Sequence, residues 1–156
     1  MTEDFVSFSL AKKLKEKGFN LHCMSFYALE NFIAEYVDSC GDCYEVDFEK
    51  DILYLNYPLR YKKFEEKMLL APTISQALKW LRKEHKVYVE PCILVDADTD
   101  ADGKVINEYI YWSFSVTNIE TGDIIYSEYE HVDDKRFDSY EQAAIAGIEY
   151  IIDNLI

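Results

Sequence analysis

The sequence predicts an α+β fold in which helices pack on antiparallel sheet, and three features indicate it. Two capping boxes of the form Thr/Ser-x-x-Gln, at residues 73–76 and 139–142, begin runs with apolar residues at helical spacing. The run EYIYWSFSVT, residues 108–117, alternates apolar and polar side chains as a half-buried strand does. The turn at Thr121-Gly122 then indicates a hairpin with a further strand. The predicted order is α-β(2-3)-α-β-β-β-α, with a three-stranded meander between two helices in the C-terminal half.

The first predicted helix covers residues 3–17, with Thr2 as its N-cap and Gly18 in the left-handed position that closes it. Its buried stripe is Val6, Leu10, Ala11 and Leu14. The stripe of the second helix is Ile74, Ala77, Leu78 and Leu81. That of the third is Ala144, Ile148, Ile151, Ile152 and Leu155. Three small residues let the third helix approach a sheet closely: Ala143, Ala146 and Gly147.

The strands are predicted from short runs rich in β-branched and aromatic residues. In the C-terminal half these runs are residues 87–95, 108–117 and 123–131. Pro91 cannot donate to a ladder, so the first of these strands is expected at a sheet edge or at a bulge. In the N-terminal half the strand-like runs are residues 21–29, 43–48 and 52–57, and residues 30–44 and 58–71 are expected to be irregular connections.

A single domain, residues 1–156, is predicted, because no linker rich in Gly, Pro or Ser divides the chain. The two similar element orders suggest structural halves 1–71 and 72–156. Six side chains are predicted to be buried together between the sheet and two helices: Trp112, Phe114, Leu78, Leu81, Ile148 and Ile151.

The charge excludes some partners and favours others. The chain has 30 acidic and 16 basic side chains, a formal net charge of −14. Such a surface repels phosphate backbones and anionic membranes and suits a basic partner. Charges interrupt the apolar runs of the first 19 residues, so no secretion signal is expected there. No run approaches the roughly 18 apolar residues of a membrane helix. A cytoplasmic protein is therefore predicted, with its four cysteines as thiols.

The strongest chemical signal is the run DADTDADGKVIN, residues 96–107. From Asp98 it matches the first six positions of a D-x-D-x-D-G calcium loop, in which alternate carboxylates converge on one hard cation. The candidate ligands are Asp98, Asp100, Asp102 and Glu108. Tyr109 occupies the twelfth position, where a calcium loop has a bidentate glutamate, and strands flank the run instead of helices. The favoured prediction is therefore a solvated turn, with a calcium-binding module as the alternative.

No constellation of catalytic residues is recognisable, so neither an enzyme activity nor a cofactor is predicted. Cys40 and Cys43 form a C-x-x-C, but a strand-like run follows where a redox pair requires a helix. A zinc site would need His22 and Cys23 as further ligands, and neighbours on a strand point to opposite faces.

The order helix, meander, helix resembles that of the double-stranded-RNA-binding fold, and aromatic residues on an open sheet can stack on bases. A nucleic-acid-binding αβββα domain is therefore a further alternative. The start of the last helix, SYEQAAIAGIEY, lacks the basic cluster that grips phosphates, and the net charge removes the main contribution to affinity. Binding to nucleic acid is accordingly disfavoured.

Three segments, MTEDFVSFSLAKKLKEKGF, APTISQALKWLRKEHKVYVE and SYEQAAIAGIEYIIDNLI, resemble small uncharacterised proteins of prophages and mobile elements in gut bacteria. The shared features are helix starts and apolar stripes, and residues 22–70 differ most. That group has no assigned activity, so the resemblance implies no catalytic or binding residue. It implies a phage or prophage accessory protein. With the acidic surface, which suits a basic partner, it predicts a non-enzymatic protein that binds an unknown protein, or in a narrower form an acidic nucleic-acid mimic.

Overall fold

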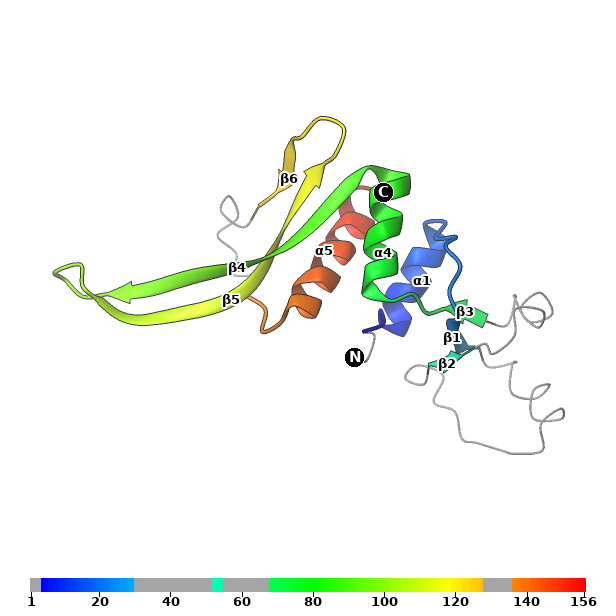
Figure 1. Cartoon of the computed structure of the whole chain (residues 1–156), viewed down its shortest axis with the longest axis horizontal. Helices are drawn as coiled ribbons and strands as arrows, with labels where there is room; N and C mark the ends of the chain where they lie inside the picture. Colours follow the sequence, from blue (N-terminus) through cyan, green and yellow to red (C-terminus); the bar gives the residue numbers. More distant parts are fainter. Residues whose placement is uncertain (1–3, 30–51, 55–67, 128–135) are drawn as a thin grey trace. The chain divides into compact units, whose positions relative to one another are not determined.

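The computed structural model describes residues 4–29, 52–54, 68–127 and 136–156 (Figure 1). Within them the elements follow the predicted order, with helices α1, α4 and α5 and two three-stranded antiparallel sheets. The predicted α+β fold class is thereby confirmed. The chain divides into two compact units, Met1–Ala77 (unit 1) and Leu78–Ile156 (unit 2), and the division falls inside α4. That the whole chain forms one domain stays a prediction.

Helix α1 of unit 1 spans Phe8–Glu16 and is shorter than predicted. Its N-cap is Ser7, whose Oγ accepts the Leu10 N–H at 3.3 Å, so the expectation of a helix starting at residue 3 is wrong. Residues 4–7 lie before the helix instead, because the backbone of this segment pairs with a segment far along the sequence. Phe5 forms an antiparallel bridge with Thr73.

Two other predictions for α1, most of its buried stripe and its closing glycine, are confirmed. Leu10, Ala11 and Leu14 are buried, as the four-residue spacing indicated. Gly18 has a φ of +85°, the left-handed conformation that a closing glycine adopts without strain. Val6 is also buried, but it lies before the helix rather than on its stripe.

The sheet of unit 1 has the order β2-β1-β3, with β1 (Ser25–Ala28), β2 (Leu53–Tyr54) and β3 (Met68–Leu70). Strand β3 lies in a segment expected to be irregular, and that expectation is wrong. Three residues are too few to show an alternating pattern, and β3 is defined by its pairing with β1. The strand predicted at 43–48 lies outside the described residues.

Helix α4 (Ile74–Trp80) begins at the predicted capping box. The Thr73 N–H donates to Gln76 Oε1 at 2.9 Å, and the Gln76 N–H donates to Thr73 Oγ1 at 3.2 Å. Two otherwise unpaired donors are satisfied in this way. The helix continues into one wider turn, η3 (Leu81–His85).

The sheet of unit 2 is the predicted meander, with the order β4-β5-β6 and β4 at one edge, as Pro91 indicated. Strands β4 (Val87–Thr99) and β5 (Val105–Asn118) extend further toward their turn than predicted. Their ladder continues to residues 100–104, which we call the aspartate loop. Strand β6 (Ile124–Tyr126) is shorter than predicted, since Ser127 already lies outside it.

Helix α5 (Tyr140–Asn154) packs on β4 and β5 and begins at its predicted cap, where Ser139 Oγ accepts the Gln142 N–H at 3.2 Å. Its approach to the sheet depends on Gly147. A Cβ at this position would collide with the Val89 side chain and lie 3.1 Å from Phe114 Cδ2. The prediction that small residues allow a close approach is thus confirmed at Gly147.

Five of the six predicted core residues of unit 2 are buried: Phe114, Leu78, Leu81, Ile148 and Ile151. Trp112 is only half-buried, so its prediction is wrong. Its ring makes an edge contact with Tyr140, the first residue of α5, with 5.6 Å between centroids. Trp112 therefore marks the place where the helix ends its cover of the sheet.

Candidate functional site

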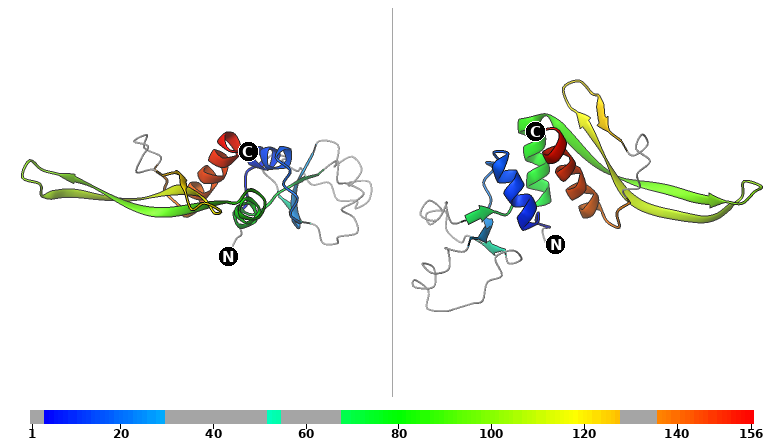
Figure 2. Two further views of the ribbon diagram at one scale, coloured as in Figure 1. Left: turned by 90° about the horizontal axis from the view of Figure 1, so that it is seen from above. Right: turned by 180° about the vertical axis from the view of Figure 1, so that it is seen from behind.

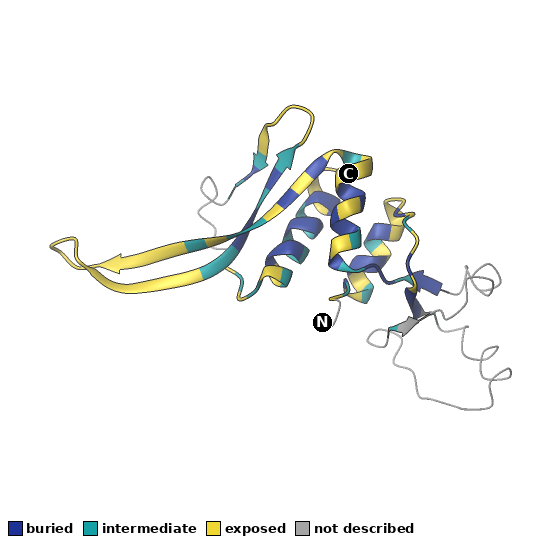
Figure 3. Ribbon diagram, in the orientation of Figure 1, coloured by how far each residue is buried: buried dark blue, intermediate teal, exposed yellow. Residues whose placement is uncertain are grey.

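The β4–β5 hairpin of unit 2 projects beyond α5, and we call residues 92–99 and 105–111 the distal ribbon (Figures 1 and 2). Strand β6 pairs with β5 only at Val116 and Thr117, and Phe137 bridges to Trp112. Among the described residues, no third strand continues along the distal ribbon. The burial colouring changes along the hairpin accordingly, from buried near α5 to exposed toward the turn (Figure 3).

Three of the exposed aliphatic side chains of the distal ribbon lie together on one face, and we call them the apolar strip. They are Ile93, Val95 and Ile110, with 55, 64 and 74% of their surface exposed. Val95 lies directly opposite Ile110 in the ladder, and Ile93 lies opposite Trp112. Directly opposed residues share a face, so the strip continues the face that α5 covers nearer the helix.

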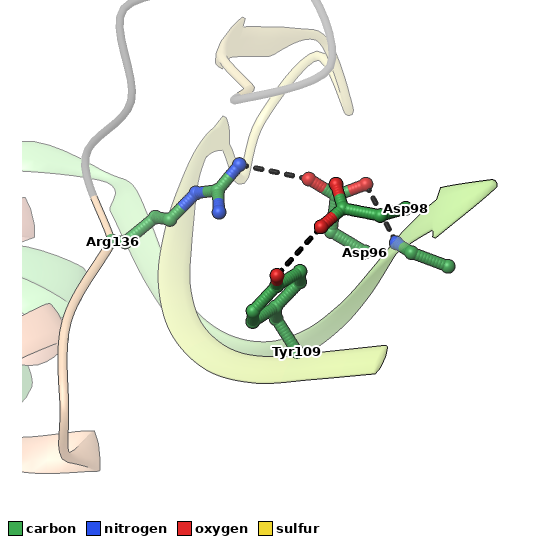
Figure 4. Close-up of polar contacts among 5 residues, drawn as sticks. Asp96, Asp98, Tyr109 and Arg136 are labelled. Atoms are coloured by element: carbon green, nitrogen blue, oxygen red, sulfur yellow. Dashed lines mark hydrogen bonds and ion pairs between the residues drawn. The ribbon is translucent and has the colours of Figure 1, made fainter. Parts of the chain in front are cut away.

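The opposite face of the ribbon is polar and is organised by two contacts (Figure 4). The Tyr109 hydroxyl donates to Asp98 Oδ2 at 2.6 Å. This hydrogen bond, with the negative charge of Asp98, raises the pKa of the Tyr109 phenol. Arg136 donates to Asp96 Oδ2 at 2.8 Å, and its guanidinium lies 4.8 Å from the centroid of the Tyr111 ring.

The aspartate loop is a tight turn organised by one of its own carboxylates. Asp100 Oδ1 accepts the N–H of Asp102 at 3.0 Å and that of Lys104 at 2.9 Å. Gly103 completes the turn with a φ of +78°, where a side chain would be strained. The carboxylate of Asp100 is thus the hydrogen-bond acceptor of an Asx turn.

The four candidate metal ligands are not brought together. Asp98 lies in the ladder opposite Asn107 and bonds to Tyr109, Asp100 bonds to its own loop, and Glu108 lies opposite Ala97. In the described ranges no group of three or more His, Cys, Asp or Glu side chains could hold a metal ion. Calcium binding stays a prediction that a titration must test.

The cysteines and histidines do not form a second candidate site in the part of the chain that the structure describes. Cys40 and Cys43 lie outside the described residues. His22 is exposed, whereas Cys23 is buried, and burial raises the pKa of its thiol to about 11. The Cys23 thiol donates to Gln76 Oε1 at 3.6 Å, a contact that holds it inside unit 1. No helix of the described residues is long and apolar enough to cross a membrane.

Comparisons with known proteins do not assign this site to any family. No protein-family model matches the chain, and neither the curated proteins nor the solved structures give a match. The apolar strip is the feature that sequence reasoning missed. The alternation of residues 108–117 placed Ile110 on the same face as Phe114, but alternation carries no information on where the covering helix stops.

Proposed function

We propose that this protein is a non-enzymatic accessory protein of phage type that acts by binding another protein through the distal ribbon. The observation that carries the proposal is the apolar strip, Ile93, Val95 and Ile110, on a ribbon uncovered by any described helix. Single exposed aliphatic residues are ordinary on protein surfaces, but contiguous ones mark interaction sites. Here Val95 and Ile110 are direct neighbours across the ladder.

The energetics of the strip support a bound state. Full burial of one isoleucine or valine side chain contributes about 1.5–3 kcal/mol. A ribbon of two strands is also only marginally stable in water without a covering layer. A partner that covers the strip therefore stabilises both the complex and the ribbon itself.

The charge supports a basic partner. Five carboxylates and a single lysine lie between residues 92 and 110, within a chain of net charge −14. Carboxylates at this density attract a positive surface and accelerate association with it. A nucleic-acid mimic is a narrower form of the same idea, but Asp96 and Asp98 already bond to Arg136 and Tyr109. The apolar strip therefore favours ordinary protein binding over mimicry of phosphates.

The experiment compares capture of proteins from a bacterial lysate by the parent chain and by two matched variants. Ile110→Ser alters the strip, and Ile124→Ser alters an isoleucine on β6 that is 63% exposed. We expect a protein that is retained at low salt by the parent and by Ile124→Ser but lost from Ile110→Ser. Retention of the same proteins by all three chains, or of none by the parent, would contradict the proposal.

A further inference from the structure

The distal ribbon has two edges, and the hydrogen bonds of Trp112 show how the backbone of β5 is oriented. The Trp112 N–H donates to the Phe137 carbonyl at 2.8 Å, and the Trp112 carbonyl accepts the Phe137 N–H at 2.9 Å. Both backbone groups of Trp112 therefore point away from β4. In a strand every second residue points its N–H and C=O to the same edge. Ile110 and Glu108 consequently direct theirs to this outer edge as well, where the described residues contain no strand beyond Trp112.

The edge of β4 differs, because it is blocked in two places. Ala97 lies opposite Glu108, so its N–H also points outward, and Asp96 Oδ1 accepts that N–H at 2.9 Å. Pro91 lies opposite Phe114, at an outward position of the same parity, and has no N–H to offer. Proline is a device that keeps a strand edge from pairing with another chain, and an N–H that already donates to a side chain is not available to a new strand. The β5 edge at Glu108 and Ile110 lacks both features.

From this difference we infer that the distal ribbon binds its partner by strand addition, with an extended basic segment of another protein pairing with the β5 edge at Glu108 and Ile110. The inference rests on the proposed function and specifies its partner. The added strand would accept from and donate to the outward N–H and C=O groups of Glu108 and Ile110. It would also turn a two-stranded ribbon of marginal stability into a three-stranded sheet.

The side chains of β5 determine the sequence that such a segment would carry. A residue beside Ile110 would lie on the apolar strip and be aliphatic, whereas one beside Glu108, on the same face, would be basic. On the opposite face the segment would meet Tyr109, and aromatic rings accept lysine or arginine. A second copy of this chain fits less well, because two ribbons rich in carboxylates repel each other.

The probe is a short synthetic peptide with the repeat Val-Lys-Lys-Lys, which can place valine beside Ile110 and lysine beside Glu108 on the same face; it is added to the full chain and followed by NMR. We expect amide exchange at Ile110 and Glu108 to slow by about tenfold or more on binding, since these N–H groups become hydrogen-bonded. The amides of Tyr109 and Tyr111 point toward β4 and should change much less. A peptide with the repeat Val-Glu-Glu-Glu, and the valine–lysine peptide with every amide N-methylated, should not bind.

Two proline variants at directly opposed residues provide the matched test. Glu108→Pro removes an outward N–H from the open edge, and Ala97→Pro removes one from the blocked edge. We expect Glu108→Pro to weaken peptide binding by about tenfold, beyond any loss in Glu108→Ala, and Ala97→Pro to change it by less than about twofold. Continued protection of the Tyr109 and Tyr111 amides shows that the ribbon is intact in each variant. If it is not intact, the N-methylated peptide decides the question without a variant.

Strand addition is overturned if no peptide binds, if the N-methylated or glutamate peptide binds as tightly as the lysine peptide, or if Glu108→Pro binds as well as Glu108→Ala. The proposed function fails in a different way. A lysate protein lost from Ile110→Ser but retained by Glu108→Pro would leave binding through the apolar strip standing and would refute strand addition alone.

Discussion

The two halves of the β4–β5 hairpin follow one alternating pattern and have opposite exposures. Phe114 and Ile110 lie four residues apart on the same face of β5, yet 1% of Phe114 is exposed and 74% of Ile110. Helix α5 covers the hairpin near Phe114, which Gly147 approaches closely. Toward its turn the hairpin is exposed (Figure 3). The pattern of a strand therefore determines the face of a side chain, whereas the covering layer determines its burial.

The largest expected difference is between Phe114→Ala and Ile110→Ala. Phe114 stacks on Tyr126 and is fully enclosed, so its truncation should lower the free energy of unfolding by about 3–5 kcal/mol. Ile110→Ala removes a side chain already in water and should change it by less than about 0.5 kcal/mol. Chemical denaturation of both variants measures the difference. A large loss in Ile110→Ala would mean that the distal ribbon is covered in solution.

The close approach of α5 to the sheet gives a second test in the covered half of the β4–β5 hairpin. Gly147→Ala should destabilise by about 1–3 kcal/mol, because the added Cβ collides with the Val89 side chain. Val89→Ala removes the Val89 methyl group that the new Cβ would meet. The double variant should therefore lose about 0.5–3 kcal/mol less than the sum of the two single losses. Simple additivity of the two losses would show that the helix can move away from the sheet.

The contact between Arg136 and Asp96 should matter little to stability, although its atoms are 2.8 Å apart. The two side chains are 41 and 50% exposed, and exposed ion pairs contribute less than about 1 kcal/mol. A double-mutant cycle with Arg136→Ala and Asp96→Asn should give a coupling below this value that falls further with added salt. A larger coupling that resists salt would indicate a desolvated pair and hence a covered ribbon.

Tyr109 should report on the polar face of the ribbon through its titration. The pKa of its phenol is raised, chiefly by the hydrogen bond to Asp98, so this bond is intact at neutral pH and is lost as the pH rises through the raised value. Asp98→Asn should lower the pKa toward the ordinary tyrosine value of about 10. NMR of the Tyr109 ring measures it. An unchanged pKa would mean that the two groups do not bond in solution.

The smallest effect is expected at the turn of the distal ribbon. If the aspartate loop is a plain turn, calcium and magnesium chlorides at equal ionic strength should raise the melting temperature equally, by screening a net charge of −14. A calcium site would give a larger increase with calcium, because the bigger ion accepts the six to eight oxygens that a flexible loop offers. A calcium-specific shift that disappears in Asp100→Asn would establish the site and contradict the interpretation of the loop as a plain turn.

Features fixed by near neighbours along the chain were predictable. The capping box at Thr73 and Gln76 and the left-handed Gly18 involve contacts over a few residues, so the sequence contains both partners in one window. The candidate site was likewise predictable only where its contacts are local in sequence. The sequence indicated the tight turn of the aspartate loop, whereas the Tyr109–Asp98 bond joins residues eleven apart across the ladder.

The sequence by itself determined the order of the elements and the face on which each apolar side chain lies, because helical and strand periods are local properties of the backbone. Only the tertiary structure decided that Phe5 pairs with Thr73, that Met68–Leu70 is a strand, and that Trp112 lies at the border of the core. The physical reason is the same in each case. Pairing and burial depend on groups that folding brings from distant positions, and neither a short strand nor an alternating run contains the position of its partner.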